Sequence, residues 1–218
     1  MTTLFDKVSG NYDSFDSAGV TDSTASFKVD QFKGWYVTIS SVEYLITGNT
    51  ATKLLFSNSI AAVGSYEIAF LGRTKLNEIE SDFSNTTKIN DDIISKKYAQ
   101  ANIDISNRVV AYLRGLYNMN RDYYTVNGAY LNEFDPLANI LNLDIVQQSF
   151  GYYVTYLIFK DLSIDQDSYN SFKSEDNFTL FKDTIKTNLA LIQIDFDEDG
   201  KASNEEKRNS VSYMRLVR

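Results

Sequence analysis

The sequence predicts an α+β protein in which a small antiparallel β module precedes a group of helices. Short β-branched and aromatic runs separated by turn residues occupy residues 34–75. Beyond residue 88 the apolar residues recur every three or four positions, which is the period of an amphipathic helix. At the end of the last expected helix, carboxylates and a glycine follow the spacing of an EF-hand calcium loop.

Residues 1–33 are expected to form an extended arm. This stretch is rich in Ser, Asp and Thr, and its aromatic residues follow no clear period. Such an arm becomes ordered only when it packs against a neighbour.

The β module, residues 34–75, is built from short runs that alternate or cluster apolar residues. The expected strands are Trp35–Ile39, Glu43–Ile46, Lys53–Phe56 and Tyr66–Phe70. Thr47–Thr50 is the best candidate for a hairpin turn, because its Gly and Asn tolerate positive φ.

The helical bundle, residues 88–194, has its clearest helix at the beginning. Asn90 can cap this helix, and Asp91 and Asp92 then lie at the positive end of its dipole. A single apolar stripe runs from Ile94 to Leu116. We therefore expect one long helix here.

The later helices are predicted from their start signals. Asp135–Pro136 combines a capping residue with proline at the first helical position. Asp144, with Gln147 three residues later, resembles a capping box. Ser174 can cap the last helix, which we expect to run directly into Asp195 after an acidic loop over 163–176.

Residues 195–218 combine a candidate metal site with a tail. The expected calcium ligands are Asp195, Asp197, Asp199, the carbonyl of Lys201, and Glu206. Gly200 permits the sharp turn, whereas Ala202 stands where paired EF-hands carry a larger apolar residue, which favours an isolated structural loop. The alternative is a solvated acidic turn without Ca²⁺.

The tail, residues 204–218, is basic and apolar, and we interpret it as a segment that docks on a neighbouring subunit. Ordinary fraying of a chain end is the alternative.

The amino-acid composition excludes several classes of function. The chain has 218 residues, no Cys and no His, which removes disulfides, thiolate nucleophiles and the commonest general base. No spacing singles out a catalytic carboxylate pair, so we expect no enzyme. A net charge of −8 argues against gripping nucleic acid, but suits a surface past which DNA slides. Plain solubility explains that charge equally well.

The sequence contains no run of about eighteen apolar residues, so we expect no membrane-spanning helix. Its first residues lack the layout of a secretory signal, which predicts a cytoplasmic protein.

The helix order from residue 88 to 194 resembles the head-to-tail connector proteins (adaptor or ring proteins) of tailed bacteriophages. The resemblance is carried by Ala99–Asp104, by Tyr152–Asp161 and by Leu189–Ile192. The β module is similar to modules of phage tail and fibre proteins, and the Asn- and Tyr-rich, Pro-poor composition would fit an AT-rich phage such as those of the crAss-like group.

This resemblance implies an adaptor-type bundle in a virion neck protein that is assembled in the host cytoplasm. About a dozen copies would form a ring beneath the portal protein and let DNA pass without binding it specifically. The family has no catalytic residues to transfer to this chain.

Two other function classes remain open from the sequence. One is a monomeric calcium-binding interaction protein, in which the loop changes the orientation of the last helix and the tail. The other is a carboxylate-based hydrolase acting on glycans, which needs two acids facing one cleft.

Overall fold

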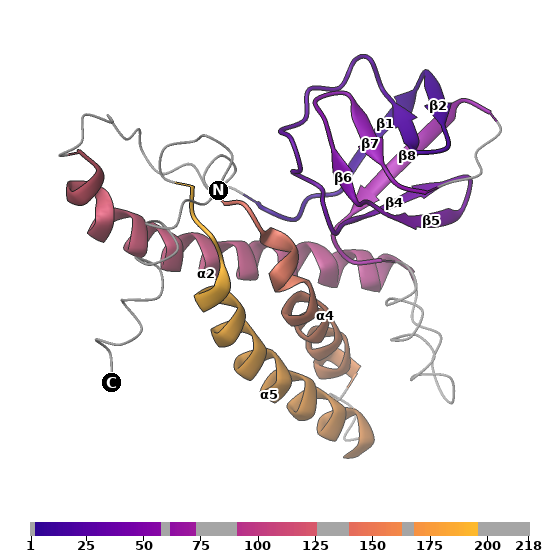
Figure 1. The fold of residues 1–218 in the computed structure, drawn as a ribbon. Helices are drawn as coiled ribbons and strands as arrows, with labels where there is room; N and C mark the ends of the chain where they lie inside the picture. The colour runs from indigo at the N-terminus through magenta and orange to yellow at the C-terminus, as the bar shows by residue number, and fades with distance from the viewer. Residues whose placement is uncertain (1–2, 58–61, 73–90, 126–139, 163–167, 196–218) are drawn as a thin grey trace. The chain divides into compact units, whose positions relative to one another are not determined.

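The computed structural model describes residues 3–57, 62–72, 91–125, 140–162 and 168–195. The chain divides into two compact units: Phe5–Ile89, here the β unit, and Met1–Leu4 with Asn90–Arg218, here the helical unit. Their described parts contain two antiparallel sheets and three α-helices, which confirms the α+β class (Figure 1).

The first sheet of the β unit has the strand order β1-β8-β4-β5. Its strands are β1 (Val8–Tyr12), β4 (Tyr36–Ile39), β5 (Val42–Leu45) and β8 (Gly64–Ala69). Val37 lies opposite Ile68 in the β4–β8 register, and both side chains are fully buried. The apolar face of β4 and β8 therefore lies in the core, as expected for alternating strands with one buried face.

The second sheet has the strand order β2-β3-β7-β6. Its strands are β2 (Ser14–Asp16), β3 (Gly19–Thr21), β6 (Gly48–Asn49) and β7 (Lys53–Leu55). A side chain at Gly19 would overlap the carbonyl oxygen of Leu54, so the β3–β7 contact requires glycine.

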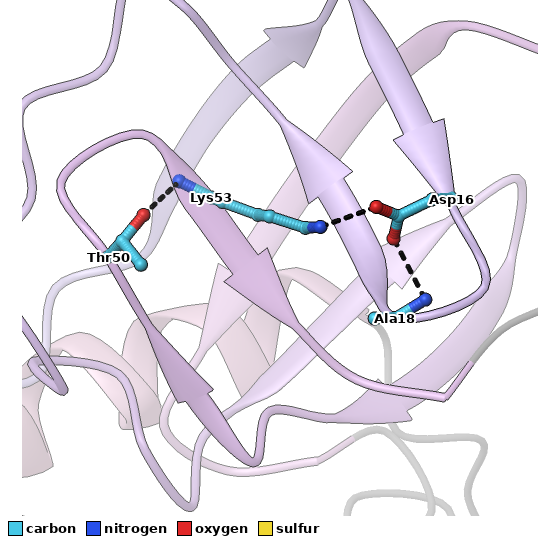
Figure 2. Close-up of polar contacts among 4 residues, drawn as sticks. All are labelled: Asp16, Ala18, Thr50 and Lys53. Atoms are coloured by element: carbon cyan, nitrogen blue, oxygen red, sulfur yellow. Dashed lines mark hydrogen bonds and ion pairs between the residues drawn. The ribbon is translucent and has the colours of Figure 1, made fainter.

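Figure 2 shows how an ion pair fastens the second sheet. Lys53 Nζ reaches across β3 to Asp16 Oδ2 at 2.6 Å, while Asp16 Oδ1 accepts the backbone N–H of Ala18 at 2.9 Å. Thr50 Oγ1 accepts the backbone N–H of Lys53 at 3.1 Å and closes the β6–β7 turn. The hydrogen bond and charge of Lys53 lower the pKa of Asp16, so the carboxylate stays ionised.

The core of the β unit is a chain of aromatic rings. Ring centroids lie 4.4 Å apart for Phe5 and Phe70, 5.0 Å for Phe70 and Trp35, 5.3 Å for Trp35 and Phe32, and 5.2 Å for Phe32 and Phe27. Most of these contacts are edge-on, the geometry that aromatic pairs prefer.

The expected extended arm over 1–33 is wrong for most of its length. Strands β1, β2 and β3 fall within it, and Phe5 and Phe32 are buried in the core of the β unit. The aromatic residues showed no period because several of them enter the core from loops, where neither helical nor strand spacing applies.

The four predicted strands are confirmed as β4, β5, β7 and β8, but the expected turn at Thr47–Thr50 is wrong. Gly48–Asn49 forms strand β6, because the buried Asn49 side chain accepts the N–H of Phe32 at 2.8 Å and donates to the carbonyl of Lys28 at 2.7 Å. A separate tight turn, between β4 and β5, uses Ser40–Ser41, both at positive φ.

The helical unit contains α2 (Asp91–Thr125), a 3₁₀ turn η1 (Leu143–Val146), α4 (Gln147–Leu162) and α5 (Ser168–Leu191). The predicted apolar stripe of α2 is buried at Ile94, Tyr98, Ala101, Ile105, Val109 and Leu116, whereas Tyr112, which was also expected there, is half-buried and its neighbour Leu113 is buried instead. None of the described helices has the length and apolar character that crossing a membrane requires.

The first residues of the chain complete the helical unit. Leu4 is buried, and its N–H donates at 2.9 Å to Ser106 Oγ on α2. Ser106 Oγ in turn donates to Asn102 Oδ1 at 3.0 Å. The polar pair in the middle of the buried stripe of α2 is therefore satisfied by the chain's own N-terminal segment.

Two expected helix starts differ from the structure, and Asp135–Pro136 lies outside the described residues. Asp144 sits inside η1 rather than capping α4. Ser174 is inside α5, six residues after the helix begins at Ser168, and is buried on the same face as Phe181. Its small side chain serves packing there, and helix formation outweighed its preference for a cap.

Gly115 gives a prediction for the stability of α2. It is an exposed helical residue, and a side chain there would meet nothing within 4 Å. Gly115→Ala should stabilise the helical unit by about 0.5–1 kcal/mol, raising Tm by about 1–4 °C, because it reduces the entropy of the unfolded chain. A thermal melt followed by far-UV circular dichroism measures this.

Gly10→Ala is the matched control, because its new side chain would collide with the ring of Tyr66 and should lower the Tm of the β unit. An unchanged or lowered Tm for Gly115→Ala would contradict the open surroundings assigned to that position.

Candidate functional site

The predicted calcium loop starts at a described residue and continues beyond the described part of the chain. Asp195 is fully buried at 0 % exposure. Asp197, Asp199, Lys201 and Glu206 lie outside the described residues. Among the side chains that the structure describes, no group of three or more His, Cys, Asp or Glu is arranged to hold a metal ion. The calcium site stays a prediction.

The approach to Asp195 differs from the expected continuous helix. α5 ends at Leu191, and Ile194 forms an isolated antiparallel bridge with Ile140. Leu141 donates its backbone N–H to the carbonyl of Gln193 at 3.2 Å, which extends the same pairing. The chain therefore reaches Asp195 as an extended segment held by backbone hydrogen bonds.

Asn142 fixes the place where this extended segment leaves α5. Its Nδ2 donates to the carbonyl of Leu191 at 3.2 Å, and its Oδ1 accepts the N–H of Gln193 at 2.7 Å. One side chain thus satisfies a carbonyl at the helix end and the amide that follows it. It sets the direction in which the chain enters the predicted loop.

An aromatic seam joins α4 to α5. Tyr153 packs on Phe181 with centroids 4.6 Å apart, and Tyr156 stacks on Phe178 at 4.6 Å. Cations flank the seam: Arg108 lies 5.4 Å from the centroid of Phe181, and Lys182 lies 4.8 Å from that of Phe178. Their attraction to the ring faces adds to the packing that sets the rotation of α5 about its axis.

Tyr153 also joins the seam to α2. Its hydroxyl donates to Asp104 Oδ2 at 2.9 Å, and burial together with this hydrogen bond and the charge of Asp104 raises its pKa to about 12. The phenol stays protonated near neutral pH and acts as a donor. This pair therefore positions α4 on α2.

A buried carboxylate in the β unit has a structural role too. Buried Asp22 accepts hydrogen bonds from Tyr66 Oη at 2.8 Å and from Thr24 Oγ1 at 2.6 Å. Hydrogen bonds from Thr24 and Tyr66 lower the pKa of Asp22, whereas burial raises the pKa of Tyr66. The carboxylate is held ionised by donors from its own fold.

One face of α5 has exposed apolar side chains, and we call it the outer face. Tyr169 is 47 % exposed, Phe172 66 %, Leu180 37 % and Leu191 55 %. At about 100° per residue they lie on the side of the helix opposite the buried Ile185. α5 therefore buries one side in the helical unit and presents the other to solvent.

Sequence reasoning missed the outer face. Tyr169 and Phe172 fall in the stretch 163–176, which was interpreted as an acidic loop, and the structure places them on α5. Leu180 and Leu191 lie off the side of α5 that carries the buried Phe181 and Ile185. The available signal was the spacing of Tyr169, Leu180 and Leu191, since eleven residues are close to three helical turns.

Asn142 gives a prediction for the end of α5. Asn142→Leu removes two hydrogen bonds and should destabilise the helical unit by about 1–3 kcal/mol. Amide hydrogen exchange at Gln193 and Ile194 should accelerate with it, because the N–H of Gln193 loses its acceptor.

The control is Gln148→Leu, which removes an exposed side-chain hydrogen bond to Tyr152 and should change stability by less than about 0.5 kcal/mol. Equal effects of Asn142→Leu and Gln148→Leu in chemical denaturation would show that Asn142 does not hold the segment.

No protein-family model, curated protein or solved structure matches this chain.

Proposed function

We propose that the protein is a structural subunit of a bacteriophage neck, which assembles into a ring between the portal and the tail. The observation that carries this proposal is the outer face of α5, where Tyr169, Phe172, Leu180 and Leu191 are exposed opposite the buried side of the helix. The kind of assembly, a ring, is proposed from the helix order of residues 88–194, which resembles that of adaptor-type bundles.

The exposed residues on α5 favour a protein partner. Aromatic side chains are enriched at the centre of protein interfaces, where they bury a large area at a small entropic cost. Phe172 is the most exposed aromatic side chain of the described residues, and Tyr169 lies one helical turn before it. Covering both rings removes apolar area from water at about 25 cal/mol per Å².

The charge of the chain fits a ring through which DNA moves. A net charge of −8 repels the phosphate backbone, so DNA would meet little that retains it. The inner surface of such a ring needs no base contacts. A structural subunit of this kind has no catalytic role.

Calcium is the ion proposed for the loop from Asp195 to Glu206. The side chain of Asp195, the first ligand position of the loop pattern, is buried, and Asn142 holds the chain that leads to it. A cation bound by Asp195, Asp197, Asp199, Lys201 and Glu206 would anchor the start of the basic tail, which then docks on a neighbouring subunit.

The calcium proposal predicts a ligand-dependent melt. Saturating Ca²⁺ should raise the Tm of the chain and a chelator should reverse it, because a ligand bound only by the folded state stabilises that state by about 2.7 kcal/mol at a hundredfold excess over Kd. Asp195→Ala and Glu206→Ala should each abolish the calcium-dependent shift. If the wild-type Tm does not respond to Ca²⁺, the loop is a solvated turn.

The assembly proposal predicts binding to the portal protein encoded with this chain. The two proteins should co-sediment, and Phe172→Ser combined with Leu191→Ser should weaken co-sedimentation at least about tenfold, since each removes an exposed apolar contact of the outer face. Val29→Ser is the matched control, because Val29 is 65 % exposed in the β unit.

A chain that stays monomeric by light scattering and does not bind portal contradicts the neck-subunit proposal. If that monomer still shows a calcium-dependent melt, the monomeric calcium-binding alternative is supported instead.

A further inference from the structure

We infer that residues 3–4, here called the strap, are a latch on α2 that opens while both units stay folded, and that its opening lets the β unit and the helical unit move independently. The strap consists of half-buried Thr3 and buried Leu4. No residue of the outer face of α5 takes part in it, so the latch is independent of the neck-subunit proposal.

The strap lies at one of the two places where the chain passes from one unit to the other. Leu4 belongs to the helical unit, and Phe5 belongs to the β unit. Both side chains are buried, and the ring centroids of Phe5 and Phe70 lie 4.4 Å apart in the core of the β unit. A docked Leu4 therefore ties the helical unit to the β unit through one peptide bond, which spans about 3.8 Å between Cα atoms.

The other connection between the units is much longer. It runs through residues 73–90, which lie outside the described part of the chain. A chain of that length spans at most about 60 Å when it is fully extended. The strap is therefore the short tether, and its release leaves only the long one.

The site that receives the strap is polar, although it lies in the apolar stripe of α2. The N–H of Leu4 donates to Ser106 Oγ at 2.9 Å, and Ser106 Oγ donates to Asn102 Oδ1 at 3.0 Å. Both polar side chains are buried. When the strap leaves, water can replace the N–H of Leu4 at Ser106, so opening exchanges one hydrogen-bond partner for another. A polar site of this kind tolerates an open state, because no polar group is left without a partner.

Each unit keeps its own packing when the strap opens. On the β side, the ring of Phe5 stays in the core, and Val8 pairs with Ile68 at the start of β1. On the helical side, α2 packs on α4 through Tyr98 and Phe150, whose ring centroids lie 4.9 Å apart. Opening exposes the side chain of Leu4 and leaves these contacts in place. Local openings of this size need much less free energy than global unfolding.

Amide hydrogen exchange tests whether the strap opens locally. The N–H of Leu4 should exchange through openings that depend little on denaturant, whereas the buried Val109 in α2 should exchange only when the helical unit unfolds. Ser106→Ala removes the acceptor of the Leu4 N–H and should speed its exchange about two- to tenfold, the factor that one net hydrogen bond corresponds to.

Ser149→Ala is the matched control, because it removes an equally buried hydroxyl on α4 whose partner is Asn188. It should leave the exchange of the Leu4 N–H unchanged. The latch is overturned if Leu4 and Val109 exchange with the same denaturant dependence, or if both serine variants speed the exchange of Leu4 equally.

NMR relaxation of the backbone amide nitrogens tests whether the strap couples the two units. Leu4→Ser removes the buried side chain and should make the rotational correlation times of the two units diverge further than in the wild-type chain. The fold of each unit is checked separately. The single Trp, Trp35, is buried in the β unit and reports on it by fluorescence, and far-UV circular dichroism reports on the helices.

Val29→Ser, at an exposed position of the β unit, should leave the two correlation times as they are in the wild-type chain. If Leu4→Ser does not fold, Leu4→Ala is measured in its place, because it retains part of the buried side chain. A folded Leu4 variant whose two units tumble as they do in the wild-type chain overturns the coupling assigned to the strap.

Discussion

The packing of α4 against α5 is the constraint on which the functional interpretation depends. Tyr153 with Phe181, and Tyr156 with Phe178, fix the rotation of α5 about its own axis. That rotation decides which residues are buried and which face water, so the seam determines that Tyr169, Phe172, Leu180 and Leu191 are exposed. A rotation of α5 by a third of a turn would bury a different set and remove the basis for assembly.

The same packing links the outer face to the candidate calcium loop. α5 ends where Asn142 binds the carbonyl of Leu191 and the amide of Gln193, and the chain then pairs with Ile140 before it reaches Asp195. A helix fixed along its length and clamped at its end delivers Asp195 to a defined place. In the proposed neck subunit, a cation bound by the loop would also fix the position at which the basic tail begins.

Much of the fold could be predicted because a helix or strand that buries one face carries apolar residues at a regular spacing. The stripe from Ile94 to Leu116 and the four strands of residues 34–75 were both apparent in this way. The arm over 1–33 was not, because Phe5 and Phe32 enter the β-unit core from loops. The residues expected to start helices were the least reliable predictors, because Ser174 packs inside α5 rather than capping it. Turns were also hard to predict, since Ser40–Ser41 forms a tight turn without glycine. Of the candidate site, Asp195 alone falls within the described residues, whereas the outer face required the helix boundaries.

The most direct test of the central claim is radical footprinting of α5 in the free chain and in its assembled form. The account predicts that Tyr169, Phe172 and Leu191 react readily in the dilute free chain and become protected on assembly, while Val29 of the β unit keeps its reactivity. If these three side chains react equally in both states, the outer face of α5 is not a contact surface and the central claim is contradicted.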